Sequence, residues 1–254
     1  MSPRIRTFFL VGILIGISAS FCFAFPPYRT EDAGTTPQGG FGLELLNAFT
    51  NSDGGKDNIT TLTLIYGLAD WIETDIDFAF LTVRPDKGQN ESGFGDILFL
   101  LKLKILGQNG ILSENEVLPD LVLEPSISIP TGDEDKGLGL GEAIPGLLLA
   151  VEETFWGKLA GRANLGYFAI NLDDDYEDNF FYGFQIDFPL FTERLRLGSE
   201  LTGVFGSDGA DPLFNLTGLV FQITDNISLN GAVEFGLKDA ASSVTGIVGV
   251  SFAF

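Results

Sequence analysis

The sequence has 254 residues, with 35 acidic and only 14 basic side chains, so its formal net charge is −21. Such a charge excludes nucleic acid as a partner, because binding to phosphates depends on Lys and Arg. Hydrophobic residues nevertheless make up 45% of the chain, which contains 24 phenylalanines, and this argues against intrinsic disorder.

The N-terminus has the order of a secretory signal peptide. Two arginines precede an apolar run at residues 8–17, and small residues follow up to Ala24. The run is too short for a membrane-spanning helix, which needs about 20 residues. We predict a signal peptide at 1–24, with Ser20 as a second cleavage site, and a periplasmic or lumenal segment at 25–39. Cleavage after Ala24 would remove two arginines and no acid, leaving a net charge of −23.

From residue 40 to the end, the sequence repeats strand-sized runs of alternating apolar and polar residues, each followed by a turn. Beyond the signal peptide no apolar stretch approaches the roughly 18 residues of a membrane helix. Twelve runs are an even number, as in bacterial single-chain barrels. We predict an all-β, transmembrane antiparallel barrel of about 12 strands at 40–254. The predicted strands are 40–49, 59–68, 72–82, 94–105, 119–129, 144–155, 158–170, 179–188, 195–205, 213–223, 227–235 and 243–254.

The alternation is clearest late in the chain. In the run 227–235, one face holds Leu229 and its apolar neighbours, and the other holds Asn230 and further small or polar residues. A soluble β-sandwich also alternates, so periodicity alone does not decide whether the apolar face meets lipid or a core. In the predicted strand 213–223 the alternation loses its phase near residues 219–222, as at a β-bulge.

The connections favour a membrane barrel. Links after even strands are short, as at Ala69–Trp71, whereas links after odd strands are longer and polar. This is the outer-membrane pattern, with both termini periplasmic. The link Leu106–Leu118 departs from it, because a long connection stands where a short one is expected. The longer links are predicted at 51–58, 84–93, 131–142 and 171–178.

Aromatic residues gather near both predicted ends of the strands. Trp71 and Trp156 lie near the short turns, and Tyr167 and Phe180 lie near the long loops. Amphipathic rings form two such girdles at the two interfaces of a membrane. Scattered aromatics in the core of a sandwich are the alternative interpretation.

The C-terminus, Val248–Phe254, looks like the terminal strand of outer-membrane barrels, in which alternating hydrophobic residues end on Phe. In that class the pattern is the signal read by the barrel assembly machinery. By this resemblance, Phe252 and Phe254 form the assembly signal.

A further resemblance is carried by segments spread over the chain: Phe25–Gly34, Gly93–Ile97, Ile129–Asp133, Lys136–Gly139 and Ala163–Tyr167. They resemble the outer-membrane transporter family named for the MetA pathway of phenol degradation. The resemblance spans nearly the whole mature chain, although Ala33-Gly34 stands where the family usually has proline. It implies a barrel for export or uptake of small, often aromatic compounds, and it specifies no solute.

The polar strand faces carry more acids than bases, and we expect these faces to line the lumen. Hairpin geometry sets several of the charges opposite one another as cross-strand pairs. The remaining acids should make the passage prefer cations or neutral solutes over anions. The expected charge pairs are Glu152 with Arg162, Asp187 with Arg196, and Glu73 and Asp75 with Lys102 and Lys104. The lumenal acids expected to lack a partner are Glu44, Asp77, Asp96, Glu124, Glu200 and Glu234.

No histidine occurs in the chain, and its single cysteine lies in the predicted signal peptide. This excludes Ser-His-Asp and Cys-His catalysis and the usual zinc, copper and iron sites, so we expect neither an enzyme nor a cofactor. A dense acidic cluster in a predicted outer loop could hold Ca²⁺ or Mg²⁺, and could bridge lipopolysaccharide phosphates through them. Solvated charge on a loop is the alternative, since the spacing is not that of a calcium loop. The cluster comprises Asp173, Asp174, Asp175, Glu177 and Asp178.

Three functional hypotheses follow. The first is an outer-membrane channel for passive passage of small solutes, with lipid, lipopolysaccharide and the assembly machinery as its partners. The second is a plugged structural or surface-interaction barrel that acts through its outer loops. The third is a soluble periplasmic β-protein, which would be extracted without detergent.

Overall fold

The computed structural model describes residues 26–86, 88–112, 118–172, 175–206, 211–238, 241 and 243–254, with the backbone alone for residues 170–172 and 175–177. The predicted signal peptide at 1–24 and the acids Asp173 and Asp174 therefore lie outside the described residues.

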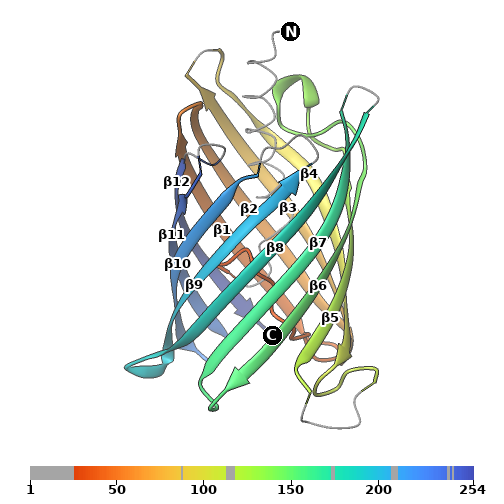
Figure 1. The fold of residues 1–254 in the computed structure, drawn as a ribbon, viewed down its shortest axis with the longest axis vertical. Coiled ribbons are helices and arrows are strands. Elements are labelled where there is room, and N and C mark those ends of the chain that lie inside the picture. Colours follow the sequence, from red (N-terminus) through yellow and green to blue (C-terminus); the bar gives the residue numbers. More distant parts are fainter. Residues whose placement is uncertain are drawn as a thin grey trace.

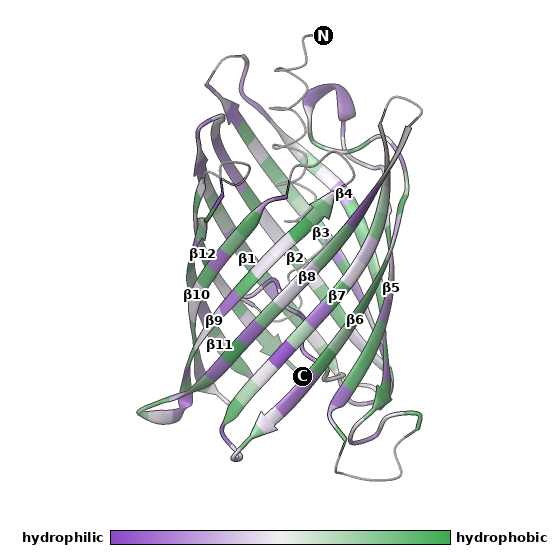
Figure 2. Ribbon diagram, in the orientation of Figure 1, coloured by the Kyte–Doolittle hydropathy of each residue, from purple (hydrophilic) through white to green (hydrophobic). Residues whose placement is uncertain are grey.

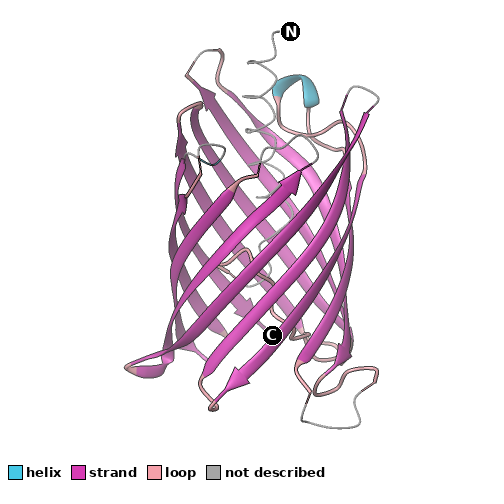
Figure 3. Ribbon diagram, viewed as in Figure 1, coloured by secondary structure: helices cyan, strands magenta, loops and turns pink. Residues whose placement is uncertain are grey.

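In the described part of the chain, twelve strands form one closed antiparallel barrel (Figures 1 and 3). The strands are β1 (Phe41–Ser52), β2 (Gly55–Ala69), β3 (Ile72–Pro85), β4 (Glu91–Leu106), β5 (Asp120–Ile129), β6 (Ile144–Phe155), β7 (Leu159–Leu172), β8 (Asp175–Leu190), β9 (Thr192–Gly206), β10 (Leu213–Thr224), β11 (Ile227–Gly236) and β12 (Ser243–Ala253). Each strand pairs with its neighbours in sequence, and β1 pairs with β12, which closes the sheet. The predicted fold class is confirmed.

The alternation of the sequence is the reason for the barrel's two faces. On β11, the Leu229 side chain is 46% exposed on the outside, whereas Asn230 is only 7% exposed inside. Figure 2 shows the same change of hydropathy from residue to residue along the strands. A closed sheet leaves no unpaired edge, so the backbone groups of every strand find partners on both sides. Among the described residues, no helix has the length and apolar character needed to cross a membrane.

We call the end with the turns at 70–71, 156–158 and 225–226 the inner end, and the opposite end, with the connection 130–143, the outer end. The outer end is at the top of Figure 1. Three outer connections are shorter than predicted: they shrink to 53–54, 86–90 and 173–174. The polar residues assigned to these loops continue the antiparallel ladders instead, since hydrogen bonding between the backbones needs no apolar face.

The irregularities also have definite positions. The long link at the inner end is present, because β4 ends at Leu106 and β5 begins at Asp120. On β10, Leu219 and Phe221 keep the outward phase, and the register shifts only between Gln222 and Thr224. The loss of phase predicted at 219–222 is therefore wrong in its position by a few residues.

Residues 26–40 run inside the barrel before β1 begins. Residues 37–39 are exposed at the inner end, where Gly39 N donates to Gly67 O over 2.8 Å. Residues 26–31 are buried further inside. The Tyr28 side chain is 0% exposed, and its hydroxyl donates to Gly218 O over 3.0 Å. The segment thus crosses the interior from the inner end toward the outer end.

Candidate solute pathway: the barrel lumen

The segment 26–40 brings its own charges into the lumen. Arg29 Nη2 lies 2.8 Å from Glu234 Oε1 on β11, and both side chains are at most 5% exposed. The Arg29 guanidinium also lies 5.1 Å from the centre of the Phe214 ring, a cation–π contact. Glu234 was expected to lack a partner, and the structure gives it one from outside the strands.

Glu200 on β9 holds the backbone of the same segment. Its carboxylate accepts the amide of Arg29 at 2.9 Å and the amide of Thr30 at 2.9 Å. Hydrogen bonds to a charged acceptor are about twice as strong as neutral ones. A second acid expected to be free is therefore engaged by the segment.

Lys102 on β4 gathers a cluster of acids. Its Nζ lies 2.8 Å from Asp32 Oδ1, 3.0 Å from Glu31 Oε2 and 3.8 Å from Glu73 Oε1. Glu73 stands directly opposite Lys102 in the ladder of β3 and β4. Glu73 also accepts the backbone amide of Thr36, so one strand charge pair anchors the segment at a further point.

Lys104 pairs with a different acid from the one expected. Its Nζ lies 2.9 Å from Asp120 Oδ2 at the start of β5. The register explains this correction, because Lys104 N donates to Trp71 O, just before β3 begins, whereas Asp75 pairs with Leu100, four residues before Lys104. The side chain therefore turns toward β5 rather than β3.

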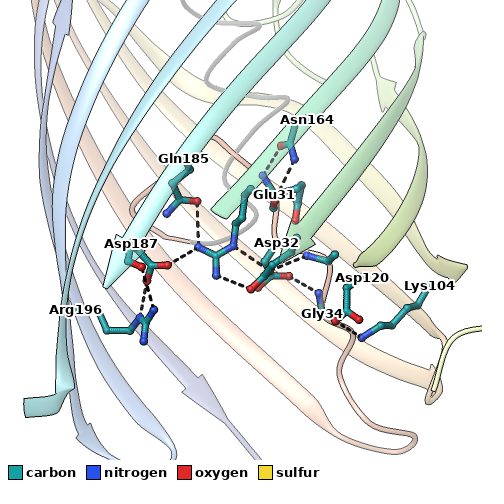
Figure 4. Close-up of polar contacts among 12 residues, drawn as sticks. Glu31, Asp32, Gly34, Lys104, Asp120, Asn164, Gln185, Asp187 and Arg196 are labelled. Carbon is teal, nitrogen blue, oxygen red and sulfur yellow. Dashed lines mark hydrogen bonds and ion pairs between the residues drawn. The ribbon is translucent and has the colours of Figure 1, made fainter. Parts of the chain in front are cut away.

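Arg162 on β7 is the centre of a second charged network, whose members Gln185, Asp187 and Arg196 are labelled in Figure 4. Its Nε lies 3.0 Å from Glu152 Oε2, directly opposite in the ladder. Its Nη1 lies 3.2 Å from both Asp187 Oδ1 and Gln185 Oε1. The Asp187 carboxylate also accepts from Arg196 Nε. The structure thus brings together both of these expected hairpin pairs and joins them into one network.

The other acids have varied surroundings. Asp77 accepts the hydroxyl of Thr63 at 2.6 Å, and Asp96 accepts two backbone amides of the connection 130–143. In contrast, one carboxylate oxygen of each of three acids is buried without a hydrogen-bond partner among the described residues. These acids are Glu44, Asp75 and Glu124.

Among the described residues, the outer acids form no group able to hold an ion. Of the predicted cluster, side chains are described only for Asp178, which is exposed and accepts the hydroxyl of Tyr167 at 2.7 Å. Nearby, a hydrogen bond from Lys136 lowers the pKa of Asp133, which lies in the loop 130–143. Across the part of the chain that the structure describes, no three His, Cys, Asp or Glu side chains meet in a group able to hold a metal ion.

The residues of the expected assembly signal lie at the seam between β1 and β12. Phe252 and Phe254 stack with their ring centres 6.5 Å apart, and Phe254 is 75% exposed. Phe254 N donates to Phe41 O over 2.8 Å. The last residue therefore completes the pairing that closes the barrel.

Sequence reasoning missed Arg29, Glu31, Asp32 and Asp120 as lumenal charges. Arg29, Glu31 and Asp32 lie outside the strands, where alternation gives no signal. Asp120 is the first residue of β5, inside the predicted strand 119–129, and was overlooked there. The available signal was indirect: charged residues within a segment predicted to be periplasmic or lumenal, facing a lumen rich in acids.

Several solved structures share this fold. The COG4313 outer membrane channel from Pseudomonas putida F1 aligns with a TM-score of 0.66 at 15% identity, over 88% of this chain and 98% of that chain. The NanC porin aligns with a TM-score of 0.59 at 10% identity, over 83% and 98% of the two chains. A KdgM porin in complex with disordered oligogalacturonate aligns with a TM-score of 0.55 at 12% identity, over 83% and 99%. No curated protein matches the chain in sequence.

At these identities the similarity of structure establishes the fold alone, whereas the sequence match identifies the family. That match runs over residues 27–254, from the segment inside the lumen to the last residue of the chain. The chain belongs to the family described as "Putative MetA-pathway of phenol degradation".

Proposed function

We propose that this protein is an outer-membrane channel for the passive passage of small solutes. The observation that carries the proposal is the reversal of polarity across the wall of a closed barrel. Inward-facing positions hold the buried charges around Lys102 and Arg162, while the outward-facing positions of the strands are mostly apolar. Contact with lipid requires an apolar outer surface, and a water-filled path requires a polar inner surface.

The comparisons support this proposal. The solved relatives are a channel and two porins, and the family description refers to phenol degradation. We therefore include small aromatic and hydrophobic compounds among the solutes. The test is reconstitution of the purified protein into planar bilayers. Stepwise single-channel currents are expected, and their absence under all conditions that preserve the folded barrel would overturn the proposal.

The acid surplus should give the channel a preference for cations. Among the six acids first assigned to this role, Glu200 and Glu234 hold Arg29 and its neighbours, and Asp96 holds a loop. The preference should therefore rest on Glu44, Asp77 and Glu124, whose charges no lysine or arginine contacts directly among the described ion pairs.

A KCl gradient across the bilayer measures this preference as the zero-current potential. The parent should favour K⁺, and the triple variant E44Q/D77N/E124Q should lose much of the preference. The matched control is E193Q, since Glu193 lies in an exposed pair with Lys158 at the inner end. Anion preference in the parent, or an equal potential in the triple variant, would refute the assignment.

The second hypothesis, a plugged barrel acting through its loops, is favoured by one observation. The segment 26–40 lies across the lumen and is anchored at Glu73, Asn164 and Glu200. Deleting most of this segment distinguishes the two functions. In a plugged barrel, the parent is closed and a variant lacking residues 26–36 conducts. In a channel, the parent conducts, and the variant conducts more.

A further inference from the structure

Two motifs that carried the family resemblance meet in space at the outer end of the barrel. The first, Gly93–Ile97, lies at the start of β4, and the second spans the connection 130–143. Asp96 joins them. Its Oδ1 accepts the amide of Gly132 at 2.9 Å, and its Oδ2 accepts the amide of Leu140 at 2.9 Å. One carboxylate therefore binds both ends of the loop.

A β-bulge aims Asp96 at the loop. Phe78 pairs with Ile97 and Phe80 with Phe94, so Gly95 and Asp96 together stand opposite a single residue of β3. Both residues of the bulge are buried. Bulges often redirect a side chain in this way. Asp96 thus faces inward like the lumenal acids, but it serves the backbone of a loop.

The hydroxyl of Thr131 makes a second connection between the loop and β4. Thr131 Oγ1 donates to Gly95 O over 3.0 Å and accepts the amide of Ile97 at 3.1 Å. Strand β5 ends at Ile129, two residues before Thr131. The loop is therefore tied to β4 as soon as it leaves the sheet.

Glycines make this close approach possible. A Cβ on Gly139 would lie 2.4 Å from Asp96 Oδ1, and a Cβ on Gly132 would lie 2.3 Å from Leu138 O. A Cβ on Gly93 would lie 2.9 Å from the Leu138 side chain. A side chain on Gly139 would push the loop away from Asp96, and one on Gly132 would disturb the close packing within the loop itself.

The fastened loop places leucines at the outer end of the lumen. Leu138 is 4% exposed beside Gly93 and Gly95 on the barrel wall. Leu140 packs against the inward-facing apolar cluster that includes Ile144 and Leu148. Both ends of the loop therefore pack against the inner wall of the barrel, while residues 133–137 between them are exposed at the outer end.

We propose that Asp96 is a positioning residue, which holds the loop 130–143 inside the outer end so that Leu138 narrows the solute passage. The narrowing rests on the proposed channel function, whereas the fastening does not. An apolar side chain that narrows the outer end would favour solutes that have apolar surface over strongly hydrated ions.

Limited digestion with trypsin tests whether Asp96 holds the loop, and it needs no transport assay. Lys136 is half exposed in the middle of the loop, and cleavage after it requires local opening of the segment. Loss of one hydrogen bond to a charged acceptor raises the equilibrium constant for such an opening by about tenfold or more. D96N should therefore be cut at Lys136–Gly137 about tenfold faster than the parent, measured by mass spectrometry on the folded barrel.

Two further variants separate charge from geometry. G139A keeps the Asp96 charge but should push the loop away, and it should be cut as fast as D96N. The matched control D77N removes another inward acid and should be cut like the parent. If D96N and G139A are both cut no faster than D77N, the fastening role of Asp96 is refuted.

Single-channel conductance then tests the narrowing. D96N, G139A and L138A should each conduct more than the parent, while L138A should keep the parent's resistance to trypsin. Faster cleavage of D96N with unchanged conductance would overturn the narrowing and leave the fastening supported. A parent barrel that never conducts would overturn the proposed function and the narrowing together, and the trypsin result would still decide the fastening.

Discussion

Buried charge in this lumen is stabilised by side chains that each meet several partners. Arg162 is the clearest example, because it contacts Glu152, Gln185 and Asp187 while its own side chain is only 6% exposed. Removing one member of such a group leaves the others buried with uncompensated charge. Breaking an exposed ion pair costs little stability, because water and salt already screen its charges.

Arg162→Met should therefore lower the free energy of unfolding by about 3–5 kcal/mol, because Glu152 and Asp187 would remain buried with less compensation. Arg194→Met is the matched control. The Arg194–Asp225 pair is 56% and 90% exposed, and its loss should cost about 1 kcal/mol or less. Urea unfolding of the barrel in lipid vesicles measures both variants. Similar losses would show that the network contributes no more than a surface pair.

The two faces of β11 give a second comparison between single residues. Leu229→Arg should lower the free energy of unfolding, because an outward arginine would enter lipid, at a cost of about 2–4 kcal/mol at the midplane and less toward the interface. Asn230→Arg should cost less, since Asn230 faces inward and hydrogen-bonds to Ser251. The same urea experiment applies, and equal losses would contradict the assignment of the faces.

At the scale of elements, the last strand matters most for closure. β12 pairs with both β1 and β11, and Phe254 extends the pairing with Phe41. A strand that fails to pair in a membrane leaves backbone groups unsatisfied. The C-terminal residue therefore belongs to the closing seam and not to a loose tail.

Phe254→Asp should strongly reduce assembly into the outer membrane, because it places a charge at this seam. The measurement is the heat-modifiable band of the folded barrel on gels of outer-membrane fractions. Phe191→Asp is the control, since Phe191 is 94% exposed in the turn between β8 and β9. Parental amounts of folded Phe254→Asp would exclude an essential role for this residue.

The strands were predictable from the sequence because alternation is a local property. All twelve predicted runs overlap the observed strands, and the pair Glu152–Arg162 follows from a tight hairpin. The outer ends of the strands were predicted too short, because polar residues there look like loop residues while their backbones still pair. The bulge at Gly95 and Asp96 has no signature in the alternation, so the hydrogen bonds of Asp96 to the loop 130–143 could not be predicted.

At the scale of the whole molecule, the contents of the lumen could not be predicted. Arg29 meets Glu234 across 205 positions of sequence, and Asp96 meets a loop about 40 residues away. Such contacts depend on where a segment without regular structure folds inside a closed sheet. Charge balance gave only the general expectation that acids in the lumen outnumber bases.

Arg29→Ala should increase the cation preference of the channel. The substitution leaves Glu234 without its ion pair and adds negative potential along the whole passage. The zero-current potential in a KCl gradient measures the effect, with Arg194→Ala as the control at the exposed inner end. An unchanged potential would mean that ions do not pass beside Arg29.

The position of residues 26–40 inside a closed sheet also constrains the order of assembly. Tyr28 fits where Gly198 leaves space for the end of its ring, with no exposed surface left, and Gly218 leaves space for Pro27. Threading this segment into a finished barrel would require the wall to give way around each bulky side chain. In the simpler order, β12 pairs with β1 and closes the barrel around a segment that is already in place. A chain extension ahead of residue 26 would therefore begin inside the lumen, whereas one after Phe254 would begin outside it.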